Sequence, residues 1–166
     1  MEPTIRKGSI VAIDTAYYYK NEPDRWDIAV FTSPEVEQMK FALGRQKVNS
    51  EAGGGIVNAA AEIFEEKQVL LRPHLFFMKR VVSLEGERIR FSEANIFIDG
   101  KELHIPRDIS SCYSRFDDFM SYKCGAEEYT IPHYSVFVLS DNVAKGKDSR
   151  HFGGVSLHNM IGRVVL

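Results

Sequence analysis

FFMKRVV, residues 76–82, is an apolar segment with two adjacent cations, Lys79 and Arg80, at its centre. Its aromatic and β-branched residues predict a β-strand, in which successive side chains point to opposite faces. Lys79 then shares a face with Phe77 and Val81. Arg80 points to the other face, whose neighbouring residues are also apolar. At least one of the two cations is therefore expected to lie against apolar side chains.

The segment by itself leaves two interpretations of Lys79 open. Long cationic side chains extend their charge to solvent, and lysine commonly protects the exposed edge of a sheet. Alternatively, burial holds the amine neutral, which would allow it to act as a base. An ordinary lysine has a pKa of about 10.4, and burial can lower it by up to roughly 3–5 units. Arg80 is excluded as a base because a guanidinium stays protonated in proteins.

The composition is that of a soluble globular domain. The chain has 166 residues, of which 44% are hydrophobic and 27% charged, enough for one domain with a core of its own. A net charge of −2 gives no basic surface for nucleic acid. No stretch approaches the roughly 18 apolar residues of a membrane span. The polar start MEPTIRKG is unlike a signal peptide, so the sequence fits a mature, soluble or truncated piece of a longer protein.

The two cysteines, Cys112 and Cys124, are separated by eleven residues, which is not the spacing of a metal site. His104 and His133 are too scattered to complete a zinc site. No metal or cofactor is therefore expected. The residues alone leave two free thiols and one disulfide equally open.

The rest of the chain predicts a mostly β protein with an inserted helical or mobile segment. Helical spacing around a glycine-rich centre places this insertion at about 33–72, and an irregular small lobe follows at about 104–128. Turns are expected at Glu85–Gly86 and, as a hairpin, at Asp99–Gly100. The predicted strands share alternating or β-branched apolar residues and lie within 9–14, 27–31, 76–84, 88–91, 95–98, 101–103, 129–142 and 160–166.

Four stretches occur in an order that resembles one family: MEPTIRKGSIVAID, DIAVF, FFMKRVVSLEGERI and LSDNVAKGKDSRHFGGV. Together they are similar to the sequence boxes of the type I signal peptidases (S26-type Ser/Lys enzymes), membrane-bound serine proteases that remove signal peptides. The resemblance covers both ends and the middle of the chain and leaves out 33–72 and 104–128. It implies a signal-peptidase-like antiparallel β fold, with a single catalytic domain over 1–166.

The resemblance also assigns catalytic roles. In the family a serine directly before the Met-x-Pro-Thr segment is the nucleophile, and the lysine of the Lys-Arg-Val-Val box is its general base. In this chain Lys79 is then the base, and the serine would stand immediately before Met1. Neither Thr4 nor Ser9 occupies the matching position, so the chain as printed is expected to be inactive. A non-catalytic paralogue that binds extended peptides without cutting them is the alternative.

By the same resemblance, the substrate lies as an added β-strand in a shallow apolar groove and is cleaved after a small residue. Core packing is an equally good interpretation of Val11 and Val30. The residues matched to the lining of the groove are Met1, Ile5, Val11, Val30, Phe76, Phe77 and Met78.

By the same resemblance, the last of the four stretches contains the residues that hold the catalytic lysine in place. Asp148 and Arg150 would form an ion pair that braces it, with Asp141 and Asn142 in the adjoining turn. The alternative is a solvated surface pair, worth about 0–1 kcal/mol. The chain departs from the family at Gly146, where a serine often hydrogen-bonds the lysine. The other departures, which suggest a divergent branch with a specialised substrate such as a pilin or a conjugation component, are Trp26, Ser83, Glu85 and Ser140.

The implied partners are signal or leader peptides of exported precursors and a membrane surface. The implied location is the cell membrane, with the catalytic domain on the extracytoplasmic side and an anchor helix upstream of Met1. Trp26, Phe31 and Tyr17–Tyr19 are candidates for bilayer contact, with an aromatic core cluster as the alternative. The resemblance also favours a disulfide, because such compartments are often oxidising.

Overall fold

The computed structural model describes residues 1–32, 76–92, 95–113 and 128–165. The chain divides into two compact units, Met1–Val30 with Met78–Leu166, and Phe31–Phe77. The predicted insertion at 33–72 and most of the predicted small lobe at 104–128 lie outside the described residues. Both therefore stay predictions.

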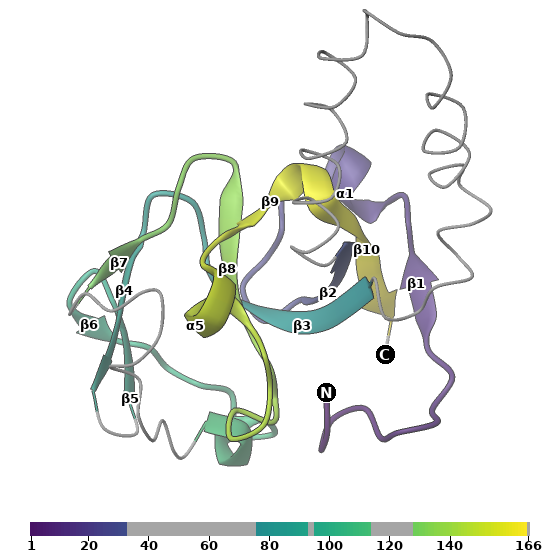
Figure 1. The fold of residues 1–166 in the computed structure, drawn as a ribbon, viewed down its shortest axis with the longest axis horizontal. Helices are drawn as coiled ribbons and strands as arrows, with labels where there is room; N and C mark the ends of the chain where they lie inside the picture. The colour runs from purple at the N-terminus through teal and green to yellow at the C-terminus, as the bar shows by residue number, and fades with distance from the viewer. Residues whose placement is uncertain (33–75, 93–94, 114–127, 166) are drawn as a thin grey trace, which may run out of the picture. The chain divides into compact units, whose positions relative to one another are not determined.

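Two β-sheets make up the described structure (Figure 1). The larger has the order β1-β10-β2-β3-β8-β9 and the smaller the order β6-β5-β4-β7. Neighbouring strands such as β3 and β8, or β4 and β5, run antiparallel, so the predicted mostly β antiparallel fold is confirmed. The strands are β1 (Ala12–Asp14), β2 (Ile28–Thr32), β3 (Phe76–Ser83), β4 (Arg88–Ser92), β5 (Asn95–Ile98), β6 (Lys101–Glu102), β7 (Tyr129–Thr130), β8 (Ser135–Leu139), β9 (Val155–Ser156) and β10 (Met160–Val165).

The helices in the described part of the chain are single turns. They are α1 (Tyr17–Lys20), α5 (Ser149–Phe152) and two 3₁₀ turns, Ser110–Tyr113 and Leu157–Asn159. Elements of this length contain too few residues for a helical period, and the sequence pattern did not predict them. In the described ranges, no helix has both the length and the apolar character needed to cross a bilayer.

Strand β3, which carries the segment at 76–82, lies inside the larger sheet, between β2 and β8. Its register with β8 pairs Arg80 with Leu139 and Val81 with Val138. The interpretation of Lys79 as the protector of a sheet edge is therefore wrong, because β3 is not an edge strand. The second half of β3, from Arg80 to Ser83, is buried.

One predicted hairpin is confirmed and one predicted strand is wrong. Asp99 and Gly100 have φ values of 50° and 77°, as the two-residue turn between β5 and β6 requires. The single strand expected within 129–142 is instead two strands, β7 and β8, which belong to different sheets. Pro132 lies between them and has no backbone N–H for a ladder.

A core cluster joins the two sheets. Val82, Phe137 and Leu139 come from the larger sheet, and Ile89 and Ile96 from the smaller. All five are at most 1% exposed, and full burial of such side chains contributes about 1.5–3 kcal/mol each. The core therefore holds β3 and β8 in place. The polar residues of the last of the four stretches begin where β8 ends, after Leu139.

Candidate active site

Lys79 is half-buried near the middle of β3. Burial lowers the pKa of its amine from the ordinary value of 10.5, and the charge of Arg150 acts in the same direction. The carboxylates of Asp148 and Asp141 oppose this shift without cancelling it. The structure therefore surrounds Lys79 with a mixed environment in which the loss of its proton is easier than in water.

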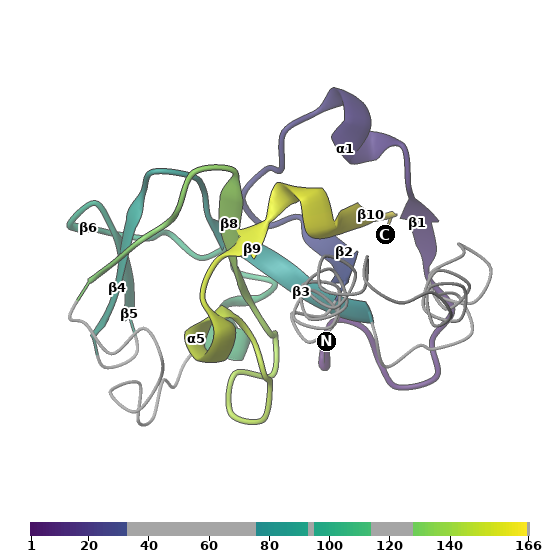
Figure 2. The same cartoon turned by 45° about the horizontal axis from the view of Figure 1, so that its top comes forward.

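The start of the chain lies beside this lysine. In both views the N-terminal end is close to β3 (Figures 1 and 2). Burial lowers the pKa of the Met1 amine, and the positive charge of Lys79 lowers it further. The first turn is closed by the Ile5 N–H, which donates to the Met1 carbonyl at 2.9 Å. The structure thus brings together Lys79 and residue 1, which the resemblance placed in one site.

A buried network centred on Asp141 holds this arrangement. Its carboxylate accepts two hydrogen bonds from Arg80, at 2.9 Å from Nε and 2.8 Å from Nη2. It also accepts from the Tyr113 hydroxyl at 2.8 Å and from the Thr4 hydroxyl. Arg80 donates from Nη1 to the Trp26 carbonyl at 2.9 Å. Asp141 therefore ties the first residues of the chain to β3 and to the end of β8.

The pairing of Arg80 with Asp141 is not predicted by the sequence patterns, which exclude Arg80 as a base and indicate a turn at Asp141. The available signal was the strand alternation, because a guanidinium on an apolar face requires a carboxylate partner. The partner, Asp141, stands 61 positions further along the chain, and no sequence pattern around it indicates that it pairs with Arg80.

Acid is expected to break this network. Burial by itself would raise the pKa of Asp141, but hydrogen bonds from Arg80 and Thr4 outweigh it and hold the pKa below 3.8. A carboxyl whose pKa is lower in the folded state stabilises the fold above its unfolded pKa and loses this effect as pH falls. We therefore expect the free energy of unfolding in urea to drop as pH falls below 3.8.

The matched variant is Asp141→Asn, which keeps the shape and removes the titrating group. We expect it to be less stable at pH 7 and to lose less of its stability between pH 7 and acid than the parent does. Equal losses in the two proteins would show that other carboxylates cause the acid sensitivity.

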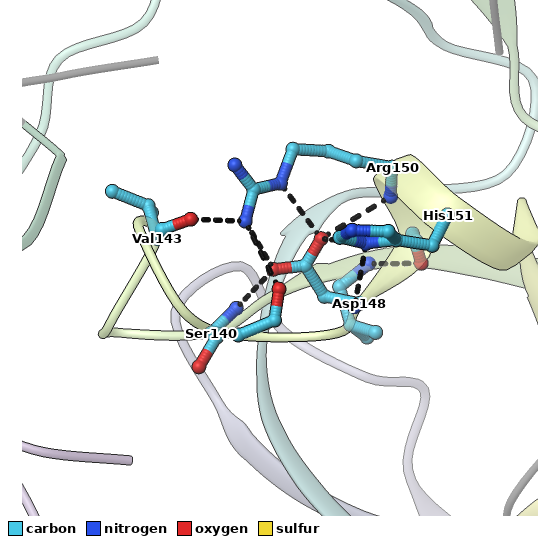
Figure 3. A network of polar contacts seen from close by, with 8 residues as sticks. Ser140, Val143, Asp148, Arg150 and His151 are labelled. Carbon is cyan, nitrogen blue, oxygen red and sulfur yellow. Dashed lines mark hydrogen bonds and ion pairs between the residues drawn. The ribbon is translucent and has the colours of Figure 1, made fainter. Parts of the chain in front are cut away.

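Asp148 and Arg150 form the ion pair that the resemblance implied, and it is buried (Figure 3). Arg150 Nε lies 2.8 Å from Oδ1, and Nη2 lies 2.9 Å from Oδ2. Arg150 Nη2 also donates to the Val143 carbonyl at 2.6 Å. Asp148 is 0% and Arg150 2% exposed, so the alternative of a solvated surface pair is wrong.

Asp148 also caps helix α5. Its carboxylate accepts from the Arg150 N–H at 3.2 Å, and its own N–H donates to His151 Nδ1 at 3.2 Å. Asn142 lies in the preceding turn, where its carbonyl accepts from the N–H groups of Gly146 at 2.7 Å and Lys145 at 3.2 Å. The loop between β8 and α5 is therefore fixed at both of its ends.

The residues matched to the substrate groove divide into two groups. Val30 is 6% exposed and packs in the core, as the core interpretation of this residue requires. The others retain exposed surface that a ligand could contact: Met1, Ile5, Val11, Phe76, Phe77 and Met78 are half-buried.

The candidates for bilayer contact also divide. Phe31 is 0% exposed and cannot face a membrane. Trp26 packs on Tyr113 with ring centroids 6.2 Å apart, next to the core. Tyr19 is 89% exposed.

The cysteine that lies in the described ranges, Cys112, is a buried free thiol, so the disulfide that the resemblance favoured is not present at that residue.

Comparison with known proteins gives one consistent result. A family profile described as signal peptidase, peptidase S26, matches residues 1–166. Signal peptidase I of Leptolyngbya laminosa is 28% identical over 166 residues, which is 100% of this chain and 63% of that protein. Thylakoidal processing peptidase 1, chloroplastic, of Arabidopsis thaliana is 25% identical over 167 residues, 99% of this chain and 38% of that protein.

A signal peptidase I from Bacillus caldolyticus is 32% identical over 92 residues, 53% of this chain and 50% of that protein. The chain thus spans about half the length of the curated relatives it matches. A crystal structure of a signal peptidase I from Enterococcus faecalis has a TM-score of 0.53 and 20% identity, and the match covers 87% of this chain and 98% of that chain. The match to this structure concerns the fold.

Proposed function

The chain belongs to the signal peptidase family, peptidase S26, and from this membership we propose that it carries the catalytic domain of a Ser/Lys endopeptidase. The proposed reaction is cleavage of signal peptides, or of related leader sequences of exported proteins, after a small residue. The observation that supports it most strongly is the half-buried Lys79, whose pKa is lowered by burial and whose neighbour is the first residue of the chain.

In the proposed mechanism, the nucleophile is the hydroxyl of a serine joined to the amino side of Met1. Neutral Lys79 takes the proton of this hydroxyl while the oxygen attacks the scissile carbonyl. The lysine then gives the proton to the leaving amine, and an acyl-enzyme remains. Lys79 next removes a proton from water, which attacks the ester carbonyl, and then returns that proton to the departing serine oxygen, so that the acid is released and both the serine hydroxyl and the neutral lysine are restored. Burial serves this cycle because an amine with a lowered pKa is available as a base nearer to neutral pH.

Each network around the lysine then has a role. Asp141 holds the first residues of the chain through Thr4, and this contact supports a position of the proposed serine next to β3. Asp148 and Arg150 hold the loop that follows β8 without supplying a second base. We propose that the extended substrate lies along the exposed faces of the half-buried groove residues.

The proposed location is the extracytoplasmic face of a membrane. Ile10 is fully exposed, and Ile13, Tyr19 and Val165 are also exposed large hydrophobic residues. Ile13 and Val165 stand on the neighbouring strands β1 and β10. Their register pairs Ile13 with Val164 and Ala12 with Val165, so Ile13 and Val165 point to opposite faces and form no common patch. The proposal of a membrane location therefore rests on family membership.

Adding a serine before Met1 is expected to create activity. The 166-residue polypeptide, produced as printed, should leave a signal-peptide substrate intact, whereas the serine-extended protein should cleave it after a small residue. The reason is that Lys79 alone supplies a base and no nucleophile. Product masses from a synthetic signal peptide measure the result and locate the cleaved bond.

The matched control carries alanine instead of serine before Met1 and should be inactive. A folded serine-extended protein that binds the peptide and never cleaves it would contradict the proposed enzyme. That outcome would instead support the non-catalytic peptide-binding alternative.

A further inference from the structure

The register of β3 and β8, continued one residue past the end of β8, brings a serine to the level of Lys79. The paired residues are Arg80 with Leu139 and Val81 with Val138. Ser140 directly follows β8, and continuing this register one step past Leu139 leads from Lys79 to Ser140. Directly opposed residues of antiparallel strands project from the same face, with Cβ atoms roughly 4.5–5.5 Å apart. Resting on the proposed function, we propose that the Ser140 hydroxyl is the positioning group for the Lys79 amine.

Ser140 is held firmly in this place. It is 2% exposed, and its backbone N–H donates to Asp148 Oδ2 at 3.0 Å (Figure 3). It stands directly before Asp141 in the chain. Asp141 and Asp148 are the two carboxylates whose charges act on the Lys79 amine. Ser140 is therefore joined to both of them, to one by the peptide bond and to the other by a hydrogen bond.

Gly146 provides the space for this serine. A Cβ atom at residue 146 would lie 2.1 Å from the Ser140 Cβ, 2.4 Å from its Oγ and 2.8 Å from the Asn142 carbonyl oxygen. The Ser140 side chain thus fills the volume that any side chain at 146 would need. Glycine at 146 and serine at 140 are complementary, and the two departures noted in the sequence form one structural unit.

The chemistry that this arrangement supplies is orientation. A neutral amine has two N–H donors and one lone pair. A hydroxyl that accepts one N–H stops the amine from rotating and leaves the lone pair directed at the nucleophile. Because a hydrogen bond from an ammonium is stronger than one from an amine, the hydroxyl also favours the protonated form. Its removal should therefore lower the pKa of Lys79 further.

The first test uses the 166-residue chain and does not depend on activity. The pKa of Lys79 is measured by NMR titration of the carbon and nitrogen atoms at the end of its side chain. In Ser140→Ala we expect a lower pKa than in the parent. The control is Ser135→Ala on the same strand, a buried serine whose hydroxyl donates to the His133 carbonyl at 3.4 Å. This control should leave the Lys79 titration unchanged.

The second test uses the serine-extended protein. Loss of orientation in Ser140→Ala should lower kcat by about 10²-fold with little change in KM, because the substrate groove is untouched. Gly146→Ser alone should lower the midpoint of thermal unfolding through the clash with Ser140. The double variant Ser140→Gly/Gly146→Ser returns a hydroxyl to the same space and should recover stability and a large part of kcat.

The outcomes separate the two proposals. A Ser140→Ala protein with the parental Lys79 pKa and the parental kcat overturns the role of Ser140. An inactive serine-extended parent overturns the proposed function, while the NMR titration still decides whether the hydroxyl contacts Lys79.

Discussion

Replacement of Lys79 with alanine should lower kcat of the serine-extended protein by about 10²–10⁴-fold or more, the usual contribution of a general base. The loss follows because no other side chain in the proposed mechanism can take the serine proton. The domain should stay folded, since Lys79 is only half-buried and is not one of the buried residues of the cluster between the sheets. Cleavage rates and thermal unfolding curves measure the two effects.

Lys79→Arg is the control that distinguishes the effect of losing the positive charge from the effect of losing the general base. Arginine keeps a long cationic side chain at residue 79 but stays protonated, so it should be as inactive as alanine. In the parent, kcat/KM should rise with pH and level off at a pH below 10.5, because burial lowers the pKa of this amine. Substantial turnover in either variant would remove Lys79 from the mechanism.

The second large effect is expected from Asp148→Ala. This change leaves the guanidinium of Arg150, 2% exposed, without its carboxylate. Breaking a buried pair from one side costs about 3–5 kcal/mol, and loss of the cap of α5 adds about 1 kcal/mol. The free energy of unfolding in urea should fall by that amount.

The double variant Asp148→Ala/Arg150→Ala provides the comparison. Because the two side chains act on each other, its destabilisation should be smaller than the sum of the two single changes. A loss of less than about 1 kcal/mol in Asp148→Ala would mean that the pair contributes no more than a solvated one.

Local patterns predicted much of the sheet structure. The Asp99–Gly100 turn was predictable because its two positive φ values suit few residues. Strands such as β3 and β5 were visible because their apolar and β-branched residues fit a pleated surface. The division of 129–142 into β7 and β8 depends on Pro132, which interrupts the ladder, and on the pairing of the two strands with different sheets, which the local pattern does not indicate.

The site could be predicted only in part, for the same reason. Lys79 and the Asp148–Arg150 pair follow from short motifs, whose members are neighbours in the sequence. The partners of Arg80 and the proposed role of Ser140 depend on the register between strands about 60 residues apart. No sequence pattern within either strand sets that register. It is fixed by the core that joins the two sheets.

The hydroxyl of Thr4 donates to Asp141, and this hydrogen bond holds the beginning of the polypeptide at a fixed position. An extended chain advances at most about 3.6 Å per residue, so a residue placed just ahead of Met1 stays within roughly 14 Å of Thr4. Any longer segment joined there is subject to the same limit on its distance from Thr4. The length and composition of that segment could then vary widely between proteins without moving the proposed serine.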